Sequence, residues 1–341
     1  MNLKGLVAVG LSIGFAAGLA SAETVLKLQT STQSSSFEYT YIAETWGPHL
    51  EAMTGGEIRI EFTPLNSIVD RKDTPEAVMA GVLSGDLTAV TYFAGRNPAF
   101  AILGDLVAGY DSVDQVQTFC RHGGGRDALQ ALWDEALPDA LHVVGCAAAA
   151  KEALVAKVPI NGVADLQGVK IRSPSGLAAT VFKMAGATPV SMSLSDVFTS
   201  LETGVIDAAD ASAYINNSTS GFHQVAKYPL YPGIHSMAVR QFTVNKGVWE
   251  GLTPDQQEVL EIWFYATYDD VRRQLDLQDR AQAAKDMAAG DITVIDWPQE
   301  ERDKFREIAV RAWEETADRS PAARAALDRH YSYMRSIGLL Q

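Results

Sequence analysis

Short apolar runs of strand length alternate with amphipathic helical patterns at the start of the chain, and this alternation constrains the fold more than any other feature. Strand-like runs occupy residues 24–32, 57–64 and 87–95, and helical patterns at 39–53 and 74–86 lie between them. Strands that alternate with helices form an open sheet whose faces are covered by helices. The sequence therefore predicts an α/β fold.

The same alternation returns in the second half. Strand-like runs lie at 142–150, 151–157, 168–173, 187–193 and 206–212, and helical patterns lie at 176–186 and 194–205. A chain of 341 residues usually divides its core between two domains. We expect two lobes, each a sheet flanked by helices: residues 23–148 with about 237–280 returning to the first, and residues 149–236 with about 281–341 packing on the second.

One helical pattern is unusually long. It runs from Thr253 to about Ala289 and begins with Thr-Pro, a common helix start. Its length suits a helix that spans both lobes. A strand at 291–298 and two helices at about 300–319 and 321–337 are expected to complete a helical C-terminus.

The first 22 residues are typical of a secretory signal. Lys4 precedes an apolar run from about Leu6 to Leu19, and Ala-Ser-Ala ends at Ala22, where cleavage is expected. Export across the inner membrane would place the protein in the periplasm. The remaining chain would carry 27 basic and 42 acidic residues, a net charge of −15, which disfavours nucleic acid as a partner. Cys120 and Cys146 suit an oxidising compartment, but spacing leaves open whether they form a disulfide or stay as buried thiols.

Catalytic motifs are largely missing from the sequence. It contains no GxSxG, HExxH, P-loop or paired CxxC, and the glycine-rich stretch at 122–127 is better explained as a turn before a helix. The six histidines show no metal-ligand spacing. We therefore expect no enzyme, no cofactor and no metal. The alternative, an exported lyase or hydrolase, would have to rely on Asp210 and His235.

A lone arginine, Arg172, ends the apolar run at 168–173. Open α/β sheets bind ligands at the carboxyl ends of their strands. A guanidinium there can hold a carboxylate through two parallel hydrogen bonds. The alternative is a surface arginine paired with a nearby aspartate. Arg172 is our main ligand-binding candidate.

Four segments in the second half, at 165–176, 184–210, 222–235 and 244–260, resemble the solute-binding proteins of tripartite ATP-independent periplasmic (TRAP) transporters, the DctP-like family. Segments of the first half, 54–62, 73–89, 92–105 and 123–129, follow the family order. The resemblance implies a two-lobed protein that closes on a small organic acid and delivers it to a membrane permease. It also implies that the arginine of the "KIR" motif, here Arg172, pairs with the ligand carboxylate, and it favours a homodimer. A ligand-sensing subunit on the same fold is a further alternative.

Segments 94–100 and 229–235 look most similar to the branch of that family that binds α-keto or hydroxy acids, some members of which hold the ligand through a cation. This chain has Ala211 and Ser236 where that branch has tryptophan and glutamate. Hard cations need several oxygen ligands, so we expect direct ligand contact without metal. The missing tryptophan widens the range of expected ligands to bulkier acids, aromatic ones included. Further pocket candidates, which follow strand ends, are Gln33, Phe37, Tyr92, Phe93, Asp210, Tyr214, Asn216 and His235.

Overall fold

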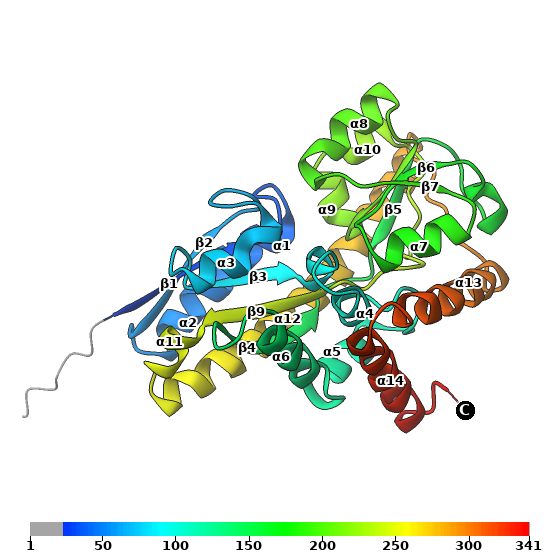
Figure 1. Cartoon of the computed structure of the whole chain (residues 1–341). Coiled ribbons are helices and arrows are strands. Elements are labelled where there is room, and N and C mark those ends of the chain that lie inside the picture. Colours follow the sequence, from blue (N-terminus) through cyan, green and yellow to red (C-terminus); the bar gives the residue numbers. More distant parts are fainter. Residues whose placement is uncertain (1–22, 341) are drawn as a thin grey trace, which may run out of the picture.

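The computed structural model describes residues 23–340, and the expected signal segment lies outside these residues. Two sheets lie side by side (Figure 1). The first has the order β2-β1-β3-β9-β4 and the second the order β5-β8-β6-β7. The two-lobed α/β prediction is confirmed. No helix of the described part of the chain is both long and apolar enough to cross a membrane.

The first sheet combines strands from both halves of the sequence. Its strands are β1 (Thr24–Thr30), β2 (Ile58–Thr63), β3 (Gly85–Ala89), β4 (Leu141–Ala148) and β9 (Val239–Asn245). β1 runs parallel to β2 and β3, whereas β9 lies antiparallel between β3 and β4. Helices pack around it: α1 (Phe37–Tyr41), α2 (Gly47–Met53), α3 (Thr74–Met79), α4 (Ala99–Gly104), α5 (Val113–His122), α6 (Gly125–Ala136) and α11 (Lys246–Glu250).

The second sheet is built from the middle of the chain. Its strands are β5 (Ala153–Ala156), β6 (Lys170–Arg172), β7 (Thr188–Val190) and β8 (Ala208–Ser212). The helices of this lobe are α7 (Leu177–Met184), α8 (Val197–Thr203), α9 (Tyr214–Thr219) and α10 (Phe222–Val225). β6 lies parallel to both β7 and β8, so the carboxyl ends of the three strands share one edge of the sheet. This edge faces the first lobe.

The predicted long helix is confirmed as α12 (Pro254–Ala289). Thr253 caps its start, and Gly290, at φ +77°, ends it in a left-handed conformation that glycine adopts without strain. In the first lobe, the indole N–H of Trp263 donates to the carbonyl of Trp46 at 2.7 Å. In the second, the carboxylate of Asp279 accepts from the N–H of Ile215 at 2.7 Å. The helix therefore connects both lobes.

The two C-terminal helices, α13 (Gln299–Ala317) and α14 (Pro321–Ser336), pack against each other. α13 packs on α7 of the second lobe and also contacts α4 of the first, whereas α14 packs on α4 and α6 of the first lobe. The hydroxyl of Tyr110 and Nδ1 of His330 on α14 are hydrogen-bonded at 2.8 Å. The expectation that all of 281–341 packs on the second lobe is thus wrong for α14.

Two local predictions also fail. The strand expected at 291–298 is reduced to a single bridge between Leu230 and Ile295. Pro229, on the partner segment, lacks the N–H group that a longer ladder would need. The helix expected at 39–53 is interrupted by a π-helical turn at Ile42–Trp46, directly before Pro48, which cannot donate a helical hydrogen bond.

Candidate functional site

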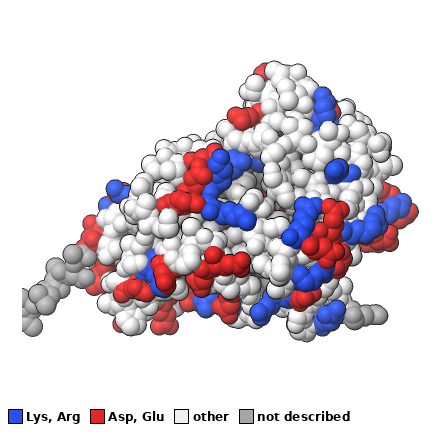
Figure 2. All heavy atoms as spheres, viewed as in Figure 1, with Lys and Arg blue, Asp and Glu red and all other residues white. Residues whose placement is uncertain are grey.

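A cleft between the two sheets collects the carboxyl ends of strands from both lobes. It holds about 770 Å³ of empty space, with the solvent at its mouth included. The first lobe lines it with Ser31, Thr32, Gln33, Thr91 and Tyr92, and the second with Arg172, Pro174, Ser175, Ser212 and Asn216, among others. Figure 2 shows basic and acidic side chains intermingled around the hollow between the lobes, so the net negative charge of the protein is not concentrated on this face.

Arg172 lies at the end of β6, the strand between β7 and β8, and only 1% of its surface is exposed. Its Nη1 donates to the carbonyl of Asp210 at 2.5 Å, and its Nε donates to the carbonyl of Met192 at 3.3 Å. The third nitrogen, Nη2, is buried without a hydrogen-bond partner among the described residues. Buried polar groups are nearly always hydrogen-bonded, so this unpaired edge in the cleft marks a place for an acceptor. The alternative of a surface arginine paired with an aspartate side chain is wrong.

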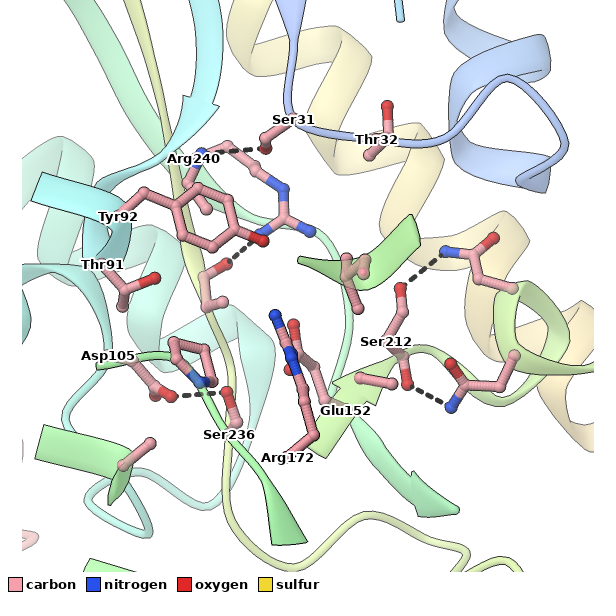
Figure 3. Close-up of a pocket in the computed structure, with 18 of the residues that line it drawn as sticks. Ser31, Thr32, Thr91, Tyr92, Asp105, Glu152, Arg172, Ser212, Ser236 and Arg240 are labelled. Carbon is pink, nitrogen blue, oxygen red and sulfur yellow. Dashed lines mark hydrogen bonds between the residues drawn. The ribbon is translucent and has the colours of Figure 1, made fainter. Parts of the chain in front are cut away.

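A second guanidinium, that of Arg240, points into the same cleft (Figure 3). It comes from β9 of the first lobe and is 8% exposed. Its Nε lies 3.5 Å from Oε1 of Glu38, which is also buried. Sequence reasoning missed this residue. The available indication was a charged side chain inside an otherwise apolar, strand-like run, "VRQFTV", since arginine is almost never fully buried unless paired.

Two acids also line the cleft, and neither was predicted. Burial, followed by the charge of Asp210, raises the pKa of Glu152 well above its ordinary value. Burial likewise raises the pKa of Asp105 to about 6, although the hydrogen bond from the Ser236 hydroxyl opposes this. The cleft thus presents both hydrogen-bond donors and a weakly acidic carboxylate.

Asp210 and His235 form a buried pair beneath the cleft. His235 Nε2 and Asp210 Oδ1 are 2.8 Å apart. Burial alone would raise the pKa of Asp210, but the charge and hydrogen bond of His235 and the charge of Arg172 lower it overall. Neither side chain lines the cleft. Their role in the structure is to support the floor on which Arg172 lies.

Glu152, Asp210 and His235 lie close enough together to be candidate metal ligands. One ligand atom of each lies within 4.8 Å of the others. Asp210 and His235 already share a hydrogen bond, and the Arg172 guanidinium is bound to the Asp210 carbonyl. A cation would have to break the first contact and lie next to a positive charge. The arrangement therefore fits a hydrogen-bond network better than a metal centre.

The predicted pocket residues divide into two groups. Four line the cleft: Gln33, Tyr92, Arg172 and Asn216. Five do not: Phe37, Phe93, Asp210, Tyr214 and His235.

The three aromatic residues of the second group are used in packing. Phe93 is a core residue whose ring packs edge-on against Trp133 at 4.9 Å. Tyr214 is fully buried and donates to Asp286 at 2.8 Å. Phe37 stacks on Tyr41 at 5.3 Å. Each follows a strand end, but its side chain turns toward the core of its own lobe.

The sequence left open whether Cys120 and Cys146 form a disulfide. Both are buried and free in the structure. Burial and a hydrogen bond with Cys146 raise the pKa of the Cys120 thiol.

Comparison with known proteins agrees with this architecture. The family model of the bacterial extracellular solute-binding proteins, family 7 (DctP), matches residues 28–320. The chain is 37% identical to a TRAP periplasmic solute-binding protein from Rhodobacter sphaeroides, solved in an apo open form. That match covers 93% of this chain and 99% of the other, with a TM-score of 0.75.

Two more distant relatives extend the comparison. A TRAP transporter solute-binding protein from Bordetella bronchiseptica, with copurified calcium and picolinate bound, shares the fold at 22% identity, with a TM-score of 0.81 and 93% of each chain covered. The monocarboxylate 2-oxoacid-binding periplasmic protein of Nostoc sp. is 24% identical over 346 residues, which cover 94% of this chain and 92% of the relative. The chain therefore belongs to family 7 of the bacterial extracellular solute-binding proteins, the DctP family, a family of solute-binding transport proteins rather than enzymes.

Proposed function

We propose that the protein binds a small organic carboxylate in the periplasm, anchors it on Arg172 and delivers it to the membrane permease of a TRAP transporter. One observation carries the anchor: Nη2 of Arg172 is buried in the cleft and has no hydrogen-bond partner within residues 23–340. An unpaired guanidinium edge in a closed site costs free energy, and a carboxylate would offset that cost with two charge-assisted hydrogen bonds.

The cleft also supports the class of ligand. Arg172 and Asn216 come from the second lobe, and Gln33 and Tyr92 from the first, so a ligand held here would contact both lobes and favour the closed form. Hydroxyl and amide groups alternate with apolar side chains on the walls. Keto and hydroxy acids suit such a lining, as do bulkier acids with an aromatic ring. The Nostoc relative, a monocarboxylate 2-oxoacid-binding protein, is consistent with the first group.

A thermal-shift screen against organic acids tests the function directly. A ligand at 100 times its Kd should add about 2.7 kcal/mol to the stability of the protein. Acids that raise the melting temperature would then be measured by calorimetry. A panel in which no carboxylate stabilises the protein would contradict the proposal.

Variants of Arg172 test the anchor. Removing one partner of a buried charge pair costs on the order of 2–5 kcal/mol, so Arg172→Ala should weaken binding by roughly 30-fold to several thousand-fold. Arg172→Lys should weaken binding less, since an ammonium keeps the charge but not the planar fork. Arg172→Ala will also lower the melting temperature, because the carbonyls of Met192 and Asp210 lose their donor. The affinity of Arg172→Lys therefore decides the matter.

Arg280→Ala is a suitable control, since Arg280 is exposed and its ion pair in the described part of the chain is with Asp276. The anchor assignment is wrong if both Arg172 variants bind the acid within threefold of the wild type. A sensing rather than a transport role would leave all these measurements unchanged, and the genes adjacent to this one would distinguish the two.

A further inference from the structure

The cleft contains two arginines, but their charges are not equally available. Arg172 is held by two backbone carbonyls, and no carboxylate of the described residues forms a salt bridge with it. Arg240 has Oε1 of Glu38 at 3.5 Å from its Nε. Both members of this second pair are buried, so their attraction is weakly screened. Arg172 therefore has no carboxylate in direct contact among the described residues, whereas Arg240 has that of Glu38 behind it.

Arg240 nevertheless keeps donors directed into the cleft. A guanidinium has five N–H groups. Glu38 approaches the Nε edge, and the hydrogen bond assigned to Arg240 among the described residues is a long one, 3.5 Å from Nη1 to the carbonyl of Ala238. In Figure 3 the guanidinium lies beside the Tyr92 ring and faces the open space above Arg172. A ligand anchored on Arg172 would meet these N–H groups.

The other charges of the cleft also favour a single negative charge on the ligand. Asp210 is paired with His235 at 2.8 Å. Asp105 lies on the cleft wall, where its carboxylate accepts from the Ser236 hydroxyl and the N–H of Met237. Among the described residues that line the cleft, the only cation besides Arg172 is Arg240, which already has Glu38 beside it, so a second carboxylate there would find no free cation and would share the cleft with Asp105. Arg71 lies at the mouth, where it stacks on Tyr92 and donates to the Ser193 hydroxyl. A neutral carbonyl or hydroxyl oxygen would not be repelled by Asp105 and would not need a cation.

We propose that Arg240, held by Glu38, is a second ligand-contacting residue that selects a neutral oxygen acceptor, so that the protein prefers a monocarboxylate with a keto, hydroxyl or amide group over a dicarboxylate of the same size. This inference rests on the proposed function. Glu38 acts as a positioning and charge-compensating residue, because it touches Arg240 but does not line the cleft.

The test uses isosteric ligands on the full mature chain. Each pair consists of a monoamide and the dicarboxylate of the same size: succinamate with succinate, and glutaramate with glutarate. Calorimetry on the wild-type protein should give at least tenfold tighter binding for the amide of each pair. Glu38→Gln removes the compensating charge and keeps the shape. It should shift this ratio by tenfold or more toward the dicarboxylate.

Glu44→Gln is the matched control. Glu44 is exposed and lies six residues further along the same helical segment, so the variant makes the same change in net charge away from Arg240. Its ligand ratio should equal that of the wild type. Arg240→Met should lower the affinity for the amide at least tenfold and reduce the discrimination.

The outcomes separate the two proposals. If no acid of the panel binds the wild-type protein, the proposed function fails and the inference fails with it. If acids bind in an Arg172-dependent way but the wild type prefers dicarboxylates, or Glu38→Gln leaves the ratio unchanged, the inference alone is overturned. Melting temperatures of the variants will show whether each is folded at the temperature of the measurement.

Discussion

At the scale of single residues, the cleft depends on how each charge is paired. Arg172 and Asp210 are neighbours in space, but their contact runs through the Asp210 carbonyl. The Asp210 carboxylate is committed to His235 instead. This division leaves the guanidinium edge of Arg172 free for a ligand, and it leaves Asp210 unavailable as a cation ligand unless His235 is displaced.

The first prediction at this scale concerns metal. Treating the purified protein with EDTA should leave ligand affinity and melting temperature unchanged, because Asp210 is paired with His235 and burial raises the pKa of Glu152, which disfavours the charged form that a cation needs. Calorimetry before and after chelation, with calcium added back in a third sample, is the measurement. A large loss of affinity in EDTA that calcium restores would show that Glu152, Asp210 and the ligand share a cation.

The residue scale also shows how much of the site the sequence could predict. The position of Arg172 in the cleft could be predicted, because a strand end before Ser-Pro is a recognisable place for a ligand contact. The position of Tyr214 could not be predicted. It also follows a strand end, but its side chain turns toward Asp286 of α12, and the sequence does not show which way the side chain will point. Arg240 reaches the cleft because β9 lies antiparallel beside β3. The return of about 237–280 to the first lobe was expected, but this pairing, which fixes the direction of the Arg240 side chain, was not.

At the scale of elements, α12 connects the lobes through buried contacts that are apolar in the first lobe and polar in the second. Its first half packs aromatic residues such as Trp263 and Phe264 in the core of the first lobe. Its second half presents the buried carboxylate of Asp279 to the first turn of α9. The capping residues Thr253 and Gly290 made this helix predictable, whereas the strand expected at 291–298 failed for lack of donors on its partner segment.

Asp279 gives a prediction about pH. Burial raises its pKa to about 7, although N–H bonds from Ile215 and Tyr214 oppose this. The native state therefore keeps the proton between pH 4 and 7, where the unfolded chain has lost it. The associated stability is fully present below about pH 4 and is lost as the pH rises to about 7, with a slope of at most about 1.4 kcal/mol per pH unit.

Asp279→Asn, which stays neutral at every pH, should lack this part of the slope. Urea unfolding of the variant and the wild type at several pH values is the measurement. The unfolding free energy of Asp279→Asn minus that of the wild type should increase between pH 4 and 7 and then level off. Asp328→Asn, an exposed change on α14, should leave the slope as it is. Parallel curves for Asp279→Asn and the wild type would contradict the prediction.

At the scale of the whole molecule, specific polar contacts join the two lobes across the mouth of the cleft. Arg71 of the first lobe donates to the Ser193 hydroxyl at 3.0 Å and lies 4.3 Å above the ring of Tyr92, which lines the cleft. The Ser220 hydroxyl donates to Oε1 of Gln33 at 3.0 Å. Gln33 and Tyr92 thus belong both to the cleft wall and to the contact between lobes, so a ligand that orders them should also favour closure.

Gly176 provides the sharpest test of that coupling. It precedes α7 in the second lobe at φ +112°, and a Cβ there would lie 3.1 Å from the Cβ atoms of Ala94 and Ala101 in the first lobe. Gly176→Ala should therefore hold the lobes apart as well as strain the backbone. Gly204→Ala is the control, since Gly204 lies in the same lobe at φ +77° but a Cβ there would meet no described atom within 4 Å. Both variants should be less stable, but only Gly176→Ala should bind its acid at least tenfold more weakly and show a larger radius of gyration in X-ray scattering with ligand present. Equal affinities for the two variants would mean that the lobes do not need this close approach to hold the ligand.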